Sequence, residues 1–239
     1  GVMFISAHYA SQARLDIPDI ARHVIRNVGY TKEVFDADAC TIMTSFTDHT
    51  ATDYVPLEFD KLDDAYIDRI VSKHQVTVFG YACNQTRDLM PLPIWLAHRF
   101  AARLDSKKVG KALPYLLPDA KTQVGVEYRT GKAARIHSIT LVASQTTADI
   151  GLEQLRNDLV EQVVKPVLEK TDCKLDSHTK LSVNPEGQLV GGGPAAHSGL
   201  TGRKTGVDTY GEFARHSGAA LSGKDPLRID RVGAYAARH

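Results

Sequence analysis

The chain has 239 residues, of which 43% are hydrophobic and 24% are charged, and this composition is typical of a globular protein. The net charge of +1 gives no general attraction to polyanions, so we expect neither nucleic acid nor a membrane as a partner. The sequence contains no apolar run long enough to cross a bilayer. Any anion-binding site is therefore expected to be local.

Three cysteines, Cys40, Cys83 and Cys173, lie far apart in the sequence. Their odd number and their spacing fit neither a disulfide framework nor a metal-ligand pattern, so we expect a reducing compartment, the cytoplasm. The first four residues resemble the middle of a strand and the last ones part of a helix. We therefore also expect a piece of a longer chain.

The first third of the chain predicts one helix, one strand and one long loop. Residues 16–28 carry apolar side chains at helical spacing, with Asp16 as the N-cap and Gly29 as the terminator. Residues 40–46 are apolar and β-branched, which predicts a strand. Residues 47–73 are rich in aspartate and have no sustained apolar period, which is typical of a lid or a disordered loop.

The rest of the chain alternates between strands and helices. A Thr130-Gly131 turn between two alternating segments predicts a β-hairpin. In chain order we expect a strand at 75–81, a helix at 90–104, hairpin strands at 123–128 and 134–143, a helix at 152–168 and a strand at 180–183. Strands paired by a hairpin, with helices between them, favour an α+β layered fold.

Residues 187–238 combine glycine and small residues with fixed charges. A backbone rich in glycine can approach a ligand closely, and its free amides together with lysine and arginine suit a polyphosphate. The cations are Arg203, Lys204, Lys224 and Arg228, and the nearby acids are Asp208, Asp225 and Asp230. This stretch therefore predicts a polyphosphate-binding segment.

Three groups of motifs resemble one family. The first is Phe79-Gly80-Tyr81-Ala82 followed by Leu89-Met90-Pro91. The second is Leu113-Pro114-Tyr115 followed by residues 118–124, which read PDAKTQV. The third and longest comprises residues 199–204, 207–211, 222–226, 230–231 and 234–238, which read GLTGRK, VDTYG, SGKDP, DR and AYAAR. Together they are similar to the S-adenosylmethionine synthetase (methionine adenosyltransferase) family, over essentially the whole chain.

The resemblance implies the fold and the domains. The family fold consists of layered sheets and helices in pseudo-repeated βαββαβ-like domains. On this basis we expect the remainder of an N-terminal domain at 1–58, a lid-like loop at 59–74, a central domain at 75–190 and the start of a C-terminal domain at 191–239. The family's N-terminal His-Pro-Asp-Lys motif does not occur in these residues.

The family transfers the adenosyl group of ATP to methionine. The methionine sulfur attacks the ribose 5′ carbon, and the triphosphate that leaves is hydrolysed to phosphate and diphosphate. Such a reaction needs in-line orientation of two substrates and cations around a highly charged leaving group. The resemblance therefore implies ATP as a substrate, Mg²⁺ and K⁺ as cofactors, and a homo- or hetero-oligomer with the active site between subunits.

The resemblance also assigns roles to single residues. The phosphate-side cations are Lys121, Arg203, Lys204, Lys224 and Arg228, the last of which replaces a lysine of the family. Asp230 matches a Mg²⁺-binding carboxylate. The positions that match the lining of the ATP pocket are Asp119, Ala120, Gln188, Leu189, His197 and Ala220.

The departures from the family pattern gather at the methionine end. Histidines stand at His74 and His197, where the family has acids, and at His8 and His49, which align with a methionine-contacting glutamate and a glutamine. Leu189 stands where the family has a stacking aromatic residue. A carboxylate holds an ammonium group, whereas a neutral imidazole accepts weakly and a protonated one repels.

Two functions therefore stay open. The chain is an enzyme that acts on methionine, a related thioether or an altered second substrate, or it is a non-catalytic paralogue that serves as a structural or regulatory subunit. The intact set of phosphate-side cations favours the first function, and the histidines favour the second. Imidazoles also bind divalent metals and anionic groups, which leaves a new ligand as a further alternative.

Overall fold

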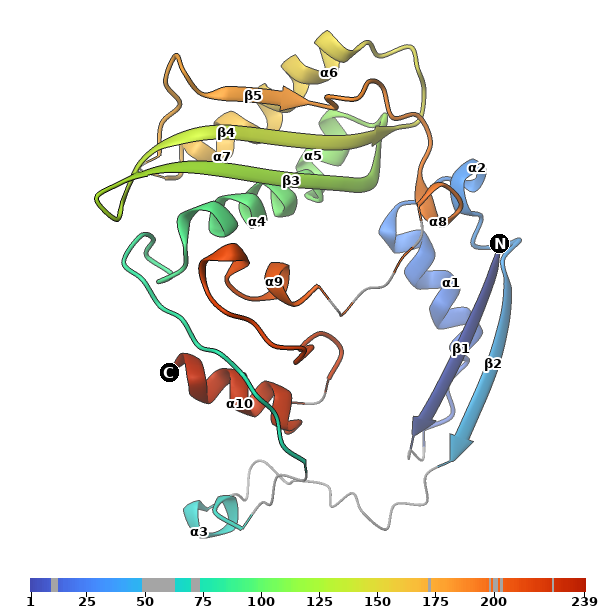
Figure 1. The fold of residues 1–239 in the computed structure, drawn as a ribbon. Helices are drawn as coiled ribbons and strands as arrows, with labels where there is room; N and C mark the ends of the chain where they lie inside the picture. Colours follow the sequence, from blue (N-terminus) through green and yellow to red (C-terminus); the bar gives the residue numbers. More distant parts are fainter. Residues whose placement is uncertain are drawn as a thin grey trace. The chain divides into compact units, whose positions relative to one another are not determined.

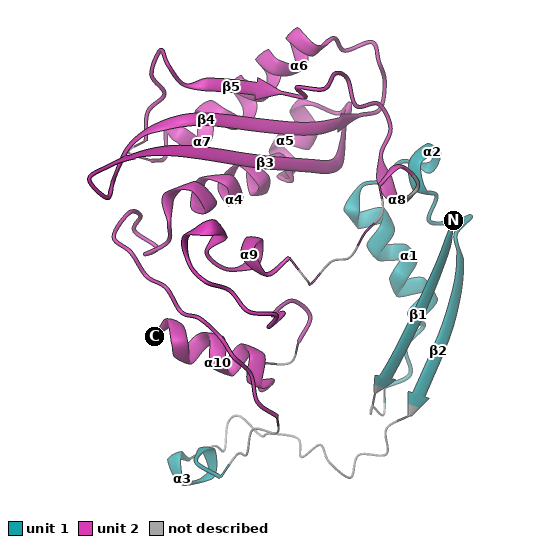
Figure 2. Ribbon diagram, viewed as in Figure 1, with its two compact units in different colours: residues 1–73 teal, residues 74–239 magenta. Residues whose placement is uncertain are grey.

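The structure is a computed structural model that describes residues 1–9, 13–48, 63–69, 74–171, 173–197, 199, 202, 204–224 and 226–239. The chain divides into two compact units, residues 1–73 and residues 74–239 (Figure 2). Each unit combines helices with its own sheet, which confirms the α+β prediction (Figure 1). Among the described helices, none has the length and apolar character needed to cross a membrane.

The first unit is built on two parallel strands. Strand β1 (Val2–Tyr9) pairs with β2 (Thr41–Asp48), starting from the pair Val2 and Thr41. Helices α1 (Ile17–Val28) and α2 (Lys32–Phe35) connect them. Parallel strands need such a crossover because the end of one strand and the start of the next lie at opposite edges of the sheet. The predicted strand at 40–46 is confirmed.

Helix α1 begins and ends where the sequence predicts. The side chain of Asp16 accepts a hydrogen bond from the backbone of Asp19, and Gly29 ends the helix at φ 96°, in the left-handed region that favours glycine. Ile25 packs with Ala37 and Cys40 in a small core. The bounds of α1 could be predicted from the sequence because both capping residues directly flank the helix.

The second unit contains a three-stranded sheet in the order β3-β4-β5. Strands β3 (Leu116–Arg129) and β4 (Lys132–Gln145) form the predicted hairpin, with longer strands than expected. Thr130 and Gly131 have φ angles of 47° and 78°, as a two-residue type I′ turn requires. Strand β5 (Lys180–Val183) pairs parallel to β4 and matches its predicted bounds.

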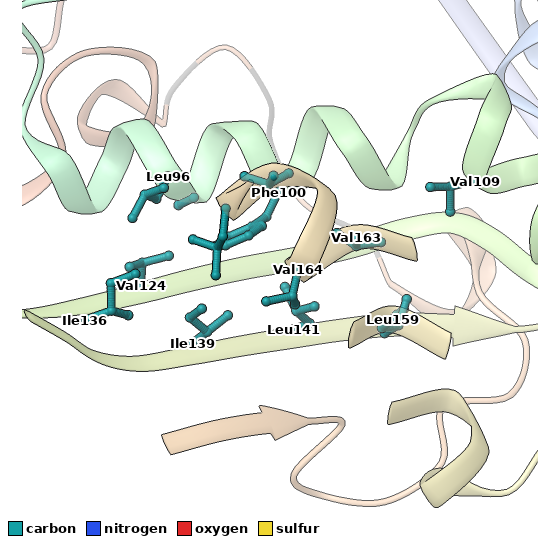
Figure 3. Close-up of a cluster of buried hydrophobic side chains, with 14 of the residues drawn as sticks. Leu96, Phe100, Val109, Val124, Ile136, Ile139, Leu141, Leu159, Val163 and Val164 are labelled. Atoms are coloured by element: carbon teal, nitrogen blue, oxygen red, sulfur yellow. The ribbon is translucent and has the colours of Figure 1, made fainter. Parts of the chain in front are cut away.

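Helices cover one face of this sheet. They are α4 (Leu92–Leu104), α5 (Lys107–Ala112) and a long helix that begins with α6 (Leu152–Leu159). The core between them and the hairpin is apolar, and Figure 3 shows its central side chains. Truncating one such side chain to alanine typically costs about 2–5 kcal/mol. The fully buried members include Leu96, Phe100, Val109, Ile139, Leu141, Leu155, Leu159, Val163 and Val164.

The predicted helix at 152–168 contains a wider turn. After α6 comes a π turn (Val160–Val164), and α7 (Lys165–Leu168) completes the helix. Pro166 has no N–H, so it cannot donate to the carbonyl of Gln162 as a helical residue normally does. Arg103 donates to that carbonyl instead, at 2.8 Å. The π turn is a common device at such a break in the ladder.

The predicted strand at 75–81 is wrong. The segment is extended, but it forms no ladder with the described strands. It packs instead along helix α10 (Ile229–Arg238), where a side chain at Gly233 would touch Val76 and Val78. A Cβ at Gly80 would overlap the carbonyl oxygen of Ala237. The alternating apolar residues of this segment therefore pack against a helix from the far end of the sequence and not against another strand.

The remaining described elements are short. They are α3 (Asp64–Ile67), α8 (Gly193–Ala196), α9 (Thr205–Asp208) and a 3₁₀ turn (Gly211–Phe213). Strand β2 and helix α3 occupy parts of the predicted loop at 47–73, and residues 49–62 and 70–73 lie outside the described residues. The lid-like role of this loop stays a prediction.

We predict that Gly80→Ala lowers the free energy of unfolding of the second unit by about 1–3 kcal/mol, because the new methyl group overlaps backbone rather than a flexible side chain. Denaturant titration measures this change. Gly110→Ala is the matched control, since Gly110 lies on α5 with open space around it and alanine favours a helix. Equal unfolding midpoints for the two variants would contradict the close packing of Gly80.

Candidate functional site

The second unit contains a cavity of about 720 Å³. It lies where β3 begins and β4 ends, and the chain that follows β5 returns there (Figure 1). It combines backbone from a glycine-rich segment with charged side chains of both signs. Its lining residues are Pro118, Asp119, Ala120, Lys121, Val142, Ser144, Asn184, Pro185, Glu186, Gly187, Gln188, Leu189, Val190, Gly191, Gly192, Ala196 and His197.

The register of the hairpin places the cavity opposite the helices. Lys121 pairs with Val142, and both line the cavity. Leu141 belongs to the apolar core, so the alternation along β4 directs Val142 to the other face. Lys121 is exposed on that face. A cation is thus placed over a concave surface without the cost of burying its charge.

The segment after β5 is tied to the end of β4 by backbone hydrogen bonds. The amide of Gln145 donates to Leu189 at 2.8 Å, and the amide of Gly191 donates to Gln145 at 2.8 Å. The side-chain amide of Gln188 donates to the carbonyl of Ile150 at 2.7 Å. These bonds extend the sheet by one more short strand-like segment, which forms the far wall of the cavity.

Asp119 fixes the glycine run Gly191-Gly192-Gly193. Its carboxylate accepts a hydrogen bond from the backbone N–H of Gly193 at 2.6 Å. A Cβ at Gly192 would overlap the same carboxylate, so a side chain there would displace Asp119 from its bond to Gly193. Gly191 and Gly193 have φ angles of 78° and 74°, in the left-handed region. The structure thus explains why glycine is favourable at Gly191 and Gly193: both have positive φ angles.

Six predicted residues therefore gather in one cavity. Asp119, Ala120 and Lys121 come from β3, and Gln188, Leu189 and His197 come from the returning segment. Leu189 is 43% exposed, and His197 is also exposed and follows α8. Residues from distant parts of the sequence thus present an apolar surface, an amide and a cation to the same space, and this suits a ligand with both a ring and an anionic group.

Other predicted cations lie away from this cavity within the second unit. Lys224 forms an ion pair with Asp230 at 2.9 Å. The hydrogen bond from Lys224 lowers the pKa of the Asp230 carboxyl below its ordinary value. Arg228 caps α10 and Lys204 precedes α9, and both are exposed. Ala220 is half-buried, and Arg203 lies outside the described residues.

The four histidines are placed unevenly. His197 lines the cavity. His8 lies on β1 in the first unit, and His74 begins the second unit with a φ of 83°. His49 lies outside the described residues. That they share one pocket stays a prediction.

Asp230 offers hard oxygen ligands of the kind that Mg²⁺ prefers. Within the described ranges, no three histidine, cysteine, aspartate or glutamate side chains gather as a metal site. Mg²⁺ is commonly held by one or two carboxylates together with substrate phosphates, so a single ionised carboxylate fits this use. Nothing in the described residues identifies a K⁺ site.

Several lining residues are not among the residues that the sequence predicts for the site. Ser144 and Asn184 are nearly fully buried beside the cavity, and Glu186 is exposed at its rim. The Asn184-Pro185 dipeptide is a recognised turn signal, so its turn was accessible from the sequence. Its contact with β4 was not, because 41 residues separate Asn184 from Ala143.

The fold and this cavity define an α+β protein with a glycine-lined cavity that carries charges of both signs and is a candidate ligand site. Residues 69–189 match the central domain of S-adenosylmethionine synthetase, and residues 191–239 match the C-terminal domain of the same family. The chain is 43% identical, over an alignment of 244 positions, to an S-adenosylmethionine synthase of Clostridium acetobutylicum. The chain therefore belongs to the S-adenosylmethionine synthetase family.

That alignment covers 100% of this chain and 62% of the relative. The chain thus spans less than two thirds of the length of the curated relative it matches. The family membership extends through the cavity, since all of its lining residues except Val190, which lies between the two matches, fall within the matched domains.

We predict that Lys224→Met raises the pKa of the Asp230 carboxyl toward its ordinary value of 3.8. The folded-state pKa is depressed, so the pair's stabilisation is fully present above the ordinary value and is lost as pH falls through the folded-state pKa. Carbon NMR titration of the carboxyl measures the shift. Lys204→Met is the control and leaves this pKa unchanged; equal titration curves for Lys224→Met and the wild type would refute the pairing.

Proposed function

We propose that the chain carries most of the ATP site of an S-adenosylmethionine synthetase and takes part in adenosyl transfer from ATP to methionine. The observation that carries this proposal is the gathering of Asp119, Lys121, Gln188 and Leu189 around one cavity of about 720 Å³. Its volume lies in the range of small-molecule sites, and its lining of apolar residues together with charged and polar side chains suits a ligand with a ring and an anionic group. Membership in the family supplies the reaction.

The residues have distinct tasks in this reaction. The sulfur of methionine attacks the ribose 5′ carbon, and the bond to the triphosphate oxygen breaks as the sulfonium forms. Lys121 and Lys204, with Arg203, attract the charge that develops on the leaving triphosphate. Lys224 and Arg228 add to this set, and Leu189 and Ala220 contact the nucleoside. Because Lys204, Ala220, Lys224 and Arg228 lie away from the cavity of their own chain, in this proposal they reach the nucleotide across the interface between subunits.

We propose that Asp230 holds Mg²⁺ together with phosphate oxygens. The ionised carboxylate of Asp230 offers the hard oxygen ligands that Mg²⁺ prefers. The ion supplies charge neutralisation on the triphosphate. Lys224, now paired with Asp230 at 2.9 Å, then donates to a phosphate oxygen. K⁺ is carried over from the family resemblance alone.

A second candidate is a non-catalytic family member that acts as a structural or regulatory subunit. One observation favours it: His197 lines the cavity at a position where the family pattern has an acid. An imidazole holds an ammonium group less well than a carboxylate does. His8, His49 and His74 are the other candidate contacts to methionine or to an altered second substrate.

The wider setting is also proposed. The site is completed between subunits of a homo- or hetero-oligomer, in the cytoplasm, without nucleic acid or membrane as a partner. The domains run over residues 1–58, 75–190 and 191–239, with a lid-like loop at 59–74.

We predict that Lys121→Met weakens ATP binding about tenfold to a hundredfold, because a charge-assisted contact to phosphate is lost. Isothermal titration calorimetry with ATP and Mg²⁺ measures the dissociation constant. Lys132→Met is the matched control, because Lys132 is an exposed lysine at the turn of the same hairpin. An unchanged dissociation constant for Lys121→Met would remove this residue from the site.

We predict that the protein, incubated with ATP, Mg²⁺ and methionine, forms a sulfonium product and hydrolyses the triphosphate. Product analysis by mass spectrometry tests this. Measurable ATP binding without product would support the non-catalytic candidate.

The double substitution His74→Asp and His197→Asp is expected to raise methionine turnover, since it restores acids at both positions. Unchanged turnover would count against the importance of these histidines.

A further inference from the structure

Asn184 is an unusual residue in the wall of the cavity. It follows β5 directly, and it is only 3% exposed. Its φ angle is 42°, in the left-handed region, where asparagine is one of the few tolerated residues other than glycine. A buried polar side chain in a strained backbone conformation needs a compensating set of hydrogen bonds.

The side chain of Asn184 supplies these bonds by imitating a strand. Its oxygen Oδ1 accepts from the backbone N–H of Ala143 at 2.9 Å, and its Nδ2 donates to the carbonyl of Ala143 at 2.9 Å. Its own backbone N–H donates to Leu141 at 3.0 Å. The amide side chain thus continues the β4 ladder for one step after β5 has ended.

This contact leaves the backbone of Asn184 free to turn. Its carbonyl accepts from the N–H of Gly187 at 2.9 Å, which closes a turn through Pro185 and Glu186. All four residues of the turn line the cavity. After the turn, the chain contacts β4 again at Gln145, whose backbone forms hydrogen bonds with Leu189 and Gly191. Hydrogen bonds at two positions of β4, Ala143 and Gln145, therefore hold the chain on either side of the turn, and we call these positions its anchors.

The first anchor, Ala143, lies next to the predicted ligand-binding residues of β3. Ala143 pairs across the hairpin with Ala120, and the neighbouring pair is Val142 with Lys121. A displacement of Asn184 therefore moves the turn relative to Ala120 and Lys121.

We propose that Asn184 is a positioning residue whose side-chain amide, by bonding both polar groups of Ala143, holds the turn 184–187 as the rim of the cavity and so sets its affinity for ATP. This inference rests on the proposed function. The amide acts through backbone position, and it does so only while it can both accept and donate.

The double bond to Ala143 gives a specific test, because aspartate at this position lacks the donor when ionised and regains it when protonated. Burial against a carbonyl oxygen raises the pKa of that carboxyl, so protonation occurs in an accessible range. Asn184→Leu has a similar size but neither donor nor acceptor at any pH. The two variants therefore differ in how their ATP affinity depends on pH.

The experiment measures the ATP dissociation constant of the wild type, Asn184→Asp and Asn184→Leu, with Mg²⁺, between about pH 8 and about pH 5, together with each melting temperature. Asp119, Lys121, Glu186 and His197 are the charged and titratable groups that line the cavity with Asn184. They are retained in every variant, so dividing by the wild-type value at each pH removes their contribution.

We expect Asn184→Asp to bind ATP about tenfold or more weakly than the wild type at high pH, and to recover most of this loss at low pH. Asn184→Leu is expected to show a similar loss at every pH. Wild-type affinity for Asn184→Asp throughout, or equal pH-independent losses for both variants, would overturn the inference. If the wild type itself fails to bind ATP, the proposed function fails and this inference with it.

Two further variants separate positioning from stability. Gln85→Leu is the control, because Gln85 is another side-chain amide that anchors a turn, by accepting from Leu92 and Tyr128, away from the cavity. It is expected to lower the melting temperature without changing the ATP affinity. Should the Asn184 variants not fold, Gly187→Ala strains the same turn at φ 113° in open space. Unchanged ATP affinity in that variant would overturn the inference.

Discussion

The attachment of the chain after β5 to the end of β4 is the constraint on which the cavity depends. A short parallel strand gives four register pairs, from Ser138 with Lys180 to Leu141 with Val183. Beyond them, Asn184 and the pair of bonds at Gln145 hold the chain against β4 without a regular ladder. Unpaired backbone groups at a sheet edge are costly when buried, so these bonds remove a penalty as well as adding attraction. The cavity is the space left where the chain departs from β4 between its two anchors.

The helices on the opposite face pack closely against the hairpin that forms one wall of the cavity. Their apolar side chains fill the space above Ile139 and Leu141, and the long helix passes Pro166 by widening one turn. Pro166 cannot donate a hydrogen bond to the carbonyl of Gln162, and Arg103 from α4 donates to it instead. This hydrogen bond links the two helices. The face toward the core is thus closely packed, while the other face presents Lys121 to solvent. This asymmetry lets one hairpin carry both the core and the candidate site.

Charge is distributed in the same local manner. A chain with a net charge of +1 has no global field to attract an anionic ligand, so a site for such a ligand needs cations that are placed individually. Lys224 is held by Asp230 at 2.9 Å, while Lys121 stands over the cavity. His197 in this setting is the clearest departure from the acid that the family pattern carries there. The effect that we propose for His197 on a second substrate rests on charge, because an imidazole cannot reproduce the permanent negative charge of a carboxylate.

The sequence by itself determined the elements whose signals are local. Asp16 and Gly29 bound α1, the Thr130-Gly131 turn sets the hairpin, and the motifs from Gly199 onward identify the family. The tertiary structure decided what depended on distant partners. Alternating apolar residues at 75–81 looked like a strand, yet α10, about 150 residues later, packs against them. The role of Asn184 was equally hidden, because a side chain that imitates a strand is recognisable only when the backbone it bonds is in place. Local patterns fix which conformations are favourable, and long-range contacts choose among the partners that satisfy them.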